Sequence, residues 1–210
     1  MTIRVRDDDV LIGSSSYDDP LKKFKSVHEL ICQSDKLMHV PAILLHHVIK
    51  DGTPGIIGIP SAVEYVREQT QAGRMKPEIH GLEHVDYGKL DKTTVIEHLK
   101  ICQEFLWKEF DIKSTRWMTP WGASQPHLHE AASIVGLKLV DCSRVKWTKL
   151  AGRHGVVQQL REGRDISYME GGEIFMHWWE GGLRLNRVVE VLKHGSWDAA
   201  KEANGKWFAE

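Results

Sequence analysis

Short apolar runs alternate with longer amphipathic stretches along this chain. The apolar runs have the length of β-strands and occupy residues 3–6, 40–45, 78–80, 117–118, 137–140, 156–160 and 173–177. The amphipathic stretches repeat apolar residues at helical spacing and occupy residues 20–36, 61–73, 94–106, 124–135 and 185–203. Strands that alternate with helices predict an α/β fold with a mainly parallel sheet, which is either open or closed into a barrel.

The length and composition indicate one globular unit. The 210 residues are predicted to form a single domain, 1–210, with a closing helix at about 185–203. Hydrophobic residues make up 41% and charged residues 27%, which excludes a disordered or fibrous protein. The 28 Lys and Arg residues balance 29 Asp and Glu residues, and the net charge of -1 argues against a nucleic-acid partner.

The chain carries no recognisable targeting or membrane signal. No apolar run approaches the ~20 residues that span a bilayer, so we expect no membrane partner. Three acidic residues, Asp7 to Asp9, follow the start before any signal-peptide core, which predicts a cytoplasmic protein. Cys32, Cys102 and Cys142 are widely spaced and are predicted to be free, buried thiols in a reducing compartment.

The residues with useful chemistry follow the predicted strands. Active sites of parallel α/β folds lie beyond the carboxyl ends of the strands, so residues at these positions are expected to meet at one rim. The residues at such positions are Asp7, Asp8, Asp9, His80, His84, Trp121, Gly122, Asp141 and His177. This convergence is a stronger signal than any one motif.

Two of these groups could hold a metal ion. The adjacent carboxylates of Asp7, Asp8 and Asp9 repel one another unless a cation or a shared proton relieves them, and alternation along a strand lets two at most share a site. His80 and His84 are four residues apart, and two His with one carboxylate form a common catalytic metal set. A solvated acidic turn and a structural His pair are the alternatives.

Two further segments could complete a catalytic site. Pro120, Trp121 and Gly122 form a rigid turn that can aim a backbone N–H group into a site, unless the turn is an ordinary loop anchored by buried tryptophans. His177 ends an apolar strand, where it is either a satisfied core group or an acid, and Trp178 beside it could form a wall that excludes water and stacks on a sugar.

The order of these motifs resembles that of the polysaccharide deacetylases, which are the NodB-homology family or family 4 carbohydrate esterases. The motifs are, in chain order, an acidic pair, HxxxH, Pro-aromatic-Gly, Asp and a strand-terminal His. The resemblance covers residues 4 to about 192. It implies a distorted (β/α) barrel of about seven parallel strands, similar to a TIM barrel. It also implies a metal-dependent hydrolase that removes N-acetyl groups from an amino sugar or polysaccharide.

The resemblance also implies a role for each site residue. Asp9, His80 and His84 would bind a divalent metal, with Zn²⁺ as the expected ion. Asp8 would be the base, with Asp7 as a one-residue alternative, and His177 would be the acid, oriented by Asp141. Trp121 would give its backbone N–H group to the oxyanion, and Arg116 and Trp178 would complete the substrate side. The chain departs from the family pattern at Val10, where the family has glycine, and at Trp178, where it often has Asp.

The predicted partner is an N-acetylated sugar or another small amide. Two alternative functions remain open at this point: a metal-dependent hydrolase of a different small-molecule amide, and a non-catalytic relative that binds carbohydrate through its tryptophans. The sequence does not determine the oligomeric state.

Overall fold

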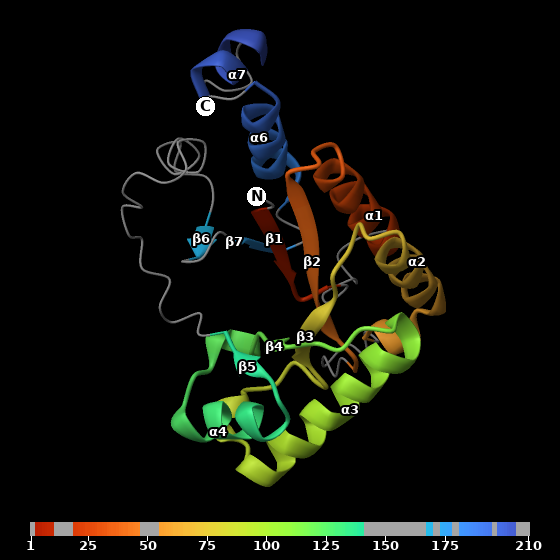
Figure 1. Cartoon of the computed structure of the whole chain (residues 1–210), viewed down its shortest axis with the longest axis vertical. Coiled ribbons are helices and arrows are strands. Elements are labelled where there is room, and N and C mark those ends of the chain that lie inside the picture. Colours follow the sequence, from red (N-terminus) through yellow and green to blue (C-terminus); the bar gives the residue numbers. More distant parts are fainter. Residues whose placement is uncertain are drawn as a thin grey trace.

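The structure is a computed structural model of the chain (Figure 1). It describes residues 3–10, 19–46, 55–140, 167–169, 173–177, 181–194 and 197–204. Within these ranges the chain forms one sheet, and α1 (Pro20–Ile31), α2 (Pro60–Gln71) and α3 (Lys92–Phe110) follow one another along its outer side (Figure 1). No helix in the described ranges is long and apolar enough to cross a membrane.

The sheet has seven strands in the order β5-β4-β3-β2-β1-β7-β6. The strands are β1 (Ile3–Asp8), β2 (Leu37–Leu44), β3 (Glu78–Gly81), β4 (Arg116–Trp117), β5 (Lys138–Leu139), β6 (Ser167–Met169) and β7 (Glu173–His177). All neighbouring pairs are parallel except β6 and β7, which are antiparallel. The predicted α/β fold with a mainly parallel sheet is therefore confirmed.

The edge strand β6 differs from the prediction. We expected seven parallel strands, whereas six are parallel and β6 pairs with β7 as an antiparallel neighbour. At three residues, Ser167–Met169, the strand is too short to produce a clear apolar run in the sequence. The strand expected at 156–160 lies outside the described residues.

The helices agree with the amphipathic stretches but differ at their ends. The remaining helices are α4 (Pro126–Ile134), α6 (Gly181–His194) and α7 (Trp197–Asn204), with 3-10 turns η2 (Ile56–Gly58), η3 (Tyr87–Lys89) and η4 (Pro120–Gly122). The predicted closing helix falls on two helices, α6 and α7. Helix α3 begins earlier than predicted because Asp91, whose side chain accepts a hydrogen bond from the Thr94 N–H at 3.0 Å, is its N-cap.

The two faces of β1 have different surroundings. Ile3 and Val5 belong to an apolar cluster with residues of α1 and α6, including Val27 and Val189. Successive side chains of a strand point to opposite faces, so Arg4, Arg6 and Asp8 lie on the other, inner face. This inner face is polar and buried at Arg6, which is 0% exposed. The strand therefore separates an apolar layer under the helices from a charged interior.

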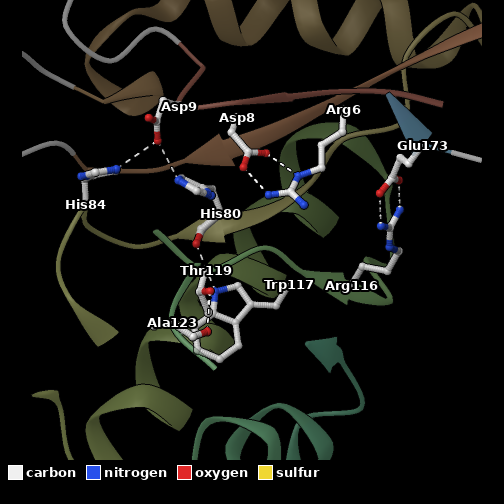
Figure 2. Close-up of polar contacts among 10 residues, drawn as sticks. All are labelled: Arg6, Asp8, Asp9, His80, His84, Arg116, Trp117, Thr119, Ala123 and Glu173. Atoms are coloured by element: carbon white, nitrogen blue, oxygen red, sulfur yellow. Dashed lines mark hydrogen bonds and ion pairs between the residues drawn. The ribbon is translucent and has the colours of Figure 1, made fainter. Parts of the chain in front are cut away.

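An ion pair across the inner face shows how the sheet curls. Arg116 of β4 forms a two-point ion pair with Glu173 of β7, in which Nη2 lies 2.6 Å from Oε2 (Figure 2). Strands β3, β2 and β1 lie between β4 and β7 in the sheet. The side chains can meet only if the sheet bends into a half-barrel, which agrees with the barrel-like fold that the motifs imply.

Two of the three cysteines, which were predicted to be free and buried, lie in the described residues. Cys32 and Cys102 form no disulfide, as expected. Cys102 is buried, whereas Cys32 is exposed at the end of α1 and not buried as predicted. Cys142 lies outside the described residues.

Candidate functional site

Asp9, His80 and His84 meet at the carboxyl ends of β1 and β3 (Figure 2). The Nε2 atoms of His80 and His84 lie 2.7 Å and 3.0 Å from the same Asp9 carboxylate oxygen, Oδ1. One ligand atom from each residue lies within 4.8 Å of the others. Among the described residues this is the group of three or more His, Cys, Asp or Glu side chains that could hold a metal ion. We name it the Asp-His-His cluster.

The backbone at Asp9 places its carboxylate in the cluster. Its φ is 54°, a left-handed conformation that Asp tolerates better than most residues because its short side chain bonds locally. This turn ends β1 directly after Asp8 and breaks the alternation of side chains. The carboxylates of Asp8 and Asp9 can therefore lie at the same edge of the sheet, although the two residues are consecutive.

The segment that carries the two histidines is shaped by Gly81 and Tyr87. His80 lies in β3, and His84 follows in a bend instead of a helical turn. The Tyr87 hydroxyl accepts a hydrogen bond from the Leu82 N–H at 2.9 Å and pins the bend. A Cβ atom at Gly81 would lie 2.9 Å from this hydroxyl, so only glycine leaves room for the tyrosine. The sequence analysis did not identify Tyr87 as a residue that shapes the site.

A second contact holds the backbone of His80. The buried Trp117 indole N–H group donates a hydrogen bond to the His80 carbonyl oxygen at 3.0 Å (Figure 2). Strand β3 is thus fixed to β4 at the residue that carries the first histidine. Trp117 was predicted only as the end of a strand, and nothing in its sequence context indicates this hydrogen bond.

The chemistry of the cluster fits a divalent metal ion. Two imidazole nitrogens and a carboxylate oxygen are the donors that zinc and related ions prefer, and three protein ligands leave room for water and substrate. His80 is 2% exposed, and its Nδ1 atom is buried with no hydrogen-bond partner among the described residues. Burial raises the pKa of the Asp9 carboxyl group, but hydrogen bonds from His80 and His84 outweigh it and hold the pKa far below its usual range. Asp9 is therefore an anion, as a metal ligand must be.

The three consecutive aspartates divide between the two faces of β1. Asp8 is buried on the inner face, where Arg6 holds both of its oxygens (Figure 2). Asp7 is 0% exposed on the opposite face, and its Oδ2 atom lies 3.3 Å from Nε2 of His39. The structure thus places Asp8, and not Asp7, on the face of Arg6 and beside the cluster residue Asp9.

A buried histidine pair continues from Asp7 toward α1. Nδ1 of His39 lies 3.0 Å from Nδ1 of His28, and the two rings stack. Burial lowers the pKa of His39 well below its ordinary value. Burial likewise lowers the pKa of His28 to about 4; the hydrogen bond with Gln69 opposes this shift, and the charge of Arg74 adds to it. Both rings are therefore neutral at neutral pH.

This histidine pair makes the fold sensitive to acid. In the unfolded chain a histidine titrates near pH 6.5, so between pH 6.5 and about 4 the unfolded state binds more protons at His28 than the folded state. The free energy of unfolding is expected to fall as pH drops through this window, by up to about 1.4 kcal/mol per pH unit for one histidine. Urea unfolding of wild type and His28→Gln, measured in EDTA at pH 7.5 and 5, tests this.

The His28→Gln variant is expected to lose less stability than wild type between these two pH values. His129→Ala is the matched control, since His129 lies exposed on α4. Equal pH slopes for wild type and His28→Gln would contradict the assignment of a neutral, buried His28.

Trp121 lies beside the cluster at the end of β4. The residue is 76% exposed, and its ring meets the His84 ring edge to face, with 4.7 Å between centroids. Its backbone is left-handed, with φ at 60°, and the turn is closed by a hydrogen bond from the Thr119 hydroxyl to the Ala123 carbonyl at 2.7 Å (Figure 2). A hollow of about 440 Å³ opens beside it, lined by Asp86 and residues 121–125. An exposed indole at the edge of a hollow can stack on an apolar ring face.

The remaining predicted site residues lie elsewhere or outside the described ranges. The Arg116 guanidinium is engaged by Glu173, so its described contacts indicate a structural role and give no support to a substrate contact. His177 ends β7, where its backbone is the register partner of Asp8. Asp141 and Trp178 lie outside the described residues. Their assigned roles stay predictions.

Comparison with known proteins finds a similar fold in solved structures of family 4 carbohydrate esterases. No family model matches the chain, and no curated protein matches its sequence. A solved family 4 carbohydrate esterase from Streptomyces lividans, in complex with acetate, superposes with a TM-score of 0.62 at 16% identity over 91% of this chain and 88% of that chain. The peptidoglycan deacetylase PdaC from Bacillus subtilis gives 0.53 at 11% identity over 91% and 82%.

A third solved structure is a CE4 family pseudoenzyme from Bacillus anthracis, with a TM-score of 0.60 at 11% identity over 92% of this chain and 61% of that chain. At such identities the likeness shows the fold alone. The fold that the motifs imply, that of the NodB-homology deacetylases, is therefore confirmed. Because the same fold occurs in enzymes and in a pseudoenzyme, activity has to be argued from the site.

Proposed function

We propose that this protein is a metal-dependent deacetylase that hydrolyses the N-acetyl group of an amino sugar. The observation that carries the proposal is the convergence of Asp9, His80 and His84 beside the buried Asp8. The fold supports it, because solved structures with this fold include a carbohydrate esterase and a deacetylase. The proposal does not depend on the identity of the sugar.

Asp9, His80 and His84 would hold the metal, with zinc as the ion that suits two imidazoles and a carboxylate. A divalent ion at this position supplies Lewis-acid chemistry, since it lowers the pKa of a coordinated water and polarises the amide carbonyl. Asp9 contributes the negative charge of the ligand set, and the two neutral imidazoles complete it. His84 lies at the open side of the cluster, next to the exposed Trp121 ring.

The protein residues would move the protons of the hydrolysis. Asp8 would accept a proton from the attacking water as its oxygen adds to the amide carbon. The backbone N–H group of Trp121 would donate a hydrogen bond to the carbonyl oxygen as negative charge develops there. His177 would give a proton to the amine as the C–N bond breaks, and Asp141 would orient that histidine. The products are a free amino sugar and acetic acid, which carries the second proton of the water and ionises to acetate. The proton on Asp8 then passes to solvent and His177 regains one from solvent, so both groups return to their starting states.

The surroundings of the cluster favour a sugar as substrate. The exposed Trp121 ring offers a flat apolar surface, and the polar residues Asp86, Ser124 and Gln125 line the adjoining hollow. Such a mixture of an aromatic face and hydrogen-bonding groups suits a ring that has an apolar face and hydroxyl groups at its edge. This pairing supports an N-acetylated sugar over a purely apolar amide as the substrate.

The test is acetate release by the zinc-loaded protein. The substrate panel contains N-acetylglucosamine, its oligomers, an acetylated xylo-oligosaccharide and simple acetamides, each measured with zinc, after chelation and after zinc is returned. We expect acetate from the amino sugars only, its loss on chelation and its recovery with zinc. Release from acetamides alone would support the alternative amidase. Stoichiometric zinc without release of acetate from any substrate would overturn catalysis and favour a binding protein.

A further inference from the structure

Arg6 and Asp8 form a buried pair next to the Asp-His-His cluster. Arg6 is 0% exposed and Asp8 is 4% exposed. Nε of Arg6 donates to Oδ1 of Asp8 at 2.6 Å, and Nη2 donates to Oδ2, so both carboxylate oxygens are held by one planar guanidinium (Figure 2). Two parallel charge-assisted hydrogen bonds fix both the position and the plane of the carboxylate.

The pair itself does not join separate parts of the fold. Arg6 and Asp8 are two residues apart on β1 and lie on the same face of that strand. By contrast, the ion pair between Arg116 and Glu173 is also two-pronged but links β4 to β7. Burying two charges costs desolvation energy, which a pair within one strand does not recover by connecting elements. The described contacts of the pair thus act on the position and plane of the Asp8 carboxylate.

That orientation matters because Asp8 directly precedes Asp9, whose carboxylate lies in the cluster. A carboxylate held by two of its lone pairs still has others with which to accept a proton. Effective proton transfer needs the acceptor within hydrogen-bond distance at a fixed angle, and a displacement of 1 Å costs about 100-fold in rate. We infer that Arg6 fixes the orientation of the Asp8 carboxylate and is thereby the positioning residue for Asp8 in the proposed reaction. The first part of the inference is structural, and the second part rests on the proposed function.

The kinetic arm uses Arg6→Lys and Arg6→Met in the zinc-loaded full chain. Arg6→Met is expected to lower kcat about 100-fold and leave KM within about twofold, because the acceptor is misplaced while the substrate contacts remain. Arg6→Lys keeps the charge but lacks the planar fork, so it recovers part of kcat. The matched control is Arg4→Met, on the same strand and face but half-exposed and 3.9 Å from Glu173. It is expected to keep the wild-type kcat, and all variants are expected to bind zinc stoichiometrically.

The structural arm needs no turnover. Crystal structures of zinc-loaded wild type and Arg6→Lys are expected to differ in the orientation of the Asp8 carboxylate, while Asp9, His80 and His84 superpose. Arg6→Lys serves here because Arg6→Met leaves a buried carboxylate without its partner and can fail to fold.

The outcomes separate the two proposals. If wild type releases no acetate, the proposed function fails, and the crystal structures alone decide the role of Arg6. An unchanged Asp8 carboxylate in Arg6→Lys overturns the inference. If wild type is active, a wild-type kcat in both variants, or a change confined to KM, overturns it as well.

Discussion

Replacing His84 by alanine is expected to remove zinc and reduce acetate release by about a thousandfold, since several kcal/mol of barrier lowering depend on the bound ion. His84 supplies one of three ligand atoms, and its Nε2 lies 3.0 Å from Asp9 Oδ1. Two ligands hold zinc far more weakly than three. The measurements are zinc content after gel filtration and acetate release from N-acetylglucosamine oligomers. The fold should persist, because the two apolar clusters of the core are formed by other residues.

The control for this prediction is His129→Ala, which removes an exposed histidine of α4. It is expected to retain zinc and activity and to show that loss of a histidine alone has no effect. If His84→Ala keeps stoichiometric zinc together with wild-type activity, the Asp-His-His cluster is not the metal site. If zinc is lost but activity survives, the reaction does not depend on the metal.

Replacing Arg116 by methionine is expected to destabilise the fold by about 3 kcal/mol, because a buried carboxylate is left without its partner. Glu173 is 5% exposed and holds Arg116 with both oxygens. Arg4, 3.9 Å away, compensates only in part. For a chain of this size that loss corresponds to a fall of about 10 °C in Tm. Urea unfolding of wild type, Arg116→Met, Glu173→Gln and the double variant measures it.

The double variant is expected to be less unstable than the sum of the two single variants, because it leaves neither charge unpaired. Lys92→Met is the matched control. It breaks an exposed ion pair with Glu130, at 2.9 Å, and should cost less than about 1 kcal/mol. A loss of stability in Arg116→Met no larger than in Lys92→Met would show that the ion pair does not hold the curl of the sheet.

The apolar pattern predicted most of the fold because buried positions of strands and helices are occupied by apolar residues at a regular spacing. Strands β1, β2, β3 and β7 coincide with the apolar runs, and the side chains of the first three are almost all buried. The antiparallel edge strand β6 escaped prediction because three residues cannot establish a period. The rim on which Asp9, His80 and His84 meet was predictable for a different reason. In a parallel sheet the carboxyl ends of the strands lie together, whatever the details of packing.

The partners of charged side chains were not predictable in the same way. Arg116 was expected to act on the substrate, but the curl of the sheet brings Glu173 to it from a strand 57 residues later in the chain. Which of Asp7 and Asp8 lies on the face of Arg6 could not be decided until it was known which residues of β1 point inward. That orientation follows from which residues pack under α1 and α6, and that contact involves distant segments. The need for glycine at position 81 was not predictable either, because it arises from the close approach of the Tyr87 hydroxyl in the folded chain.

The division of β1 into two polar networks limits how this strand can change. Arg6 and Asp8 belong to the interior, whereas Asp7 belongs to the histidine pair under α1. A one-residue insertion or deletion would exchange the two faces and bury each charged group against the wrong neighbours. Strand β1 can therefore vary in evolution by substitution, while changes of length are confined to the segments that flank it.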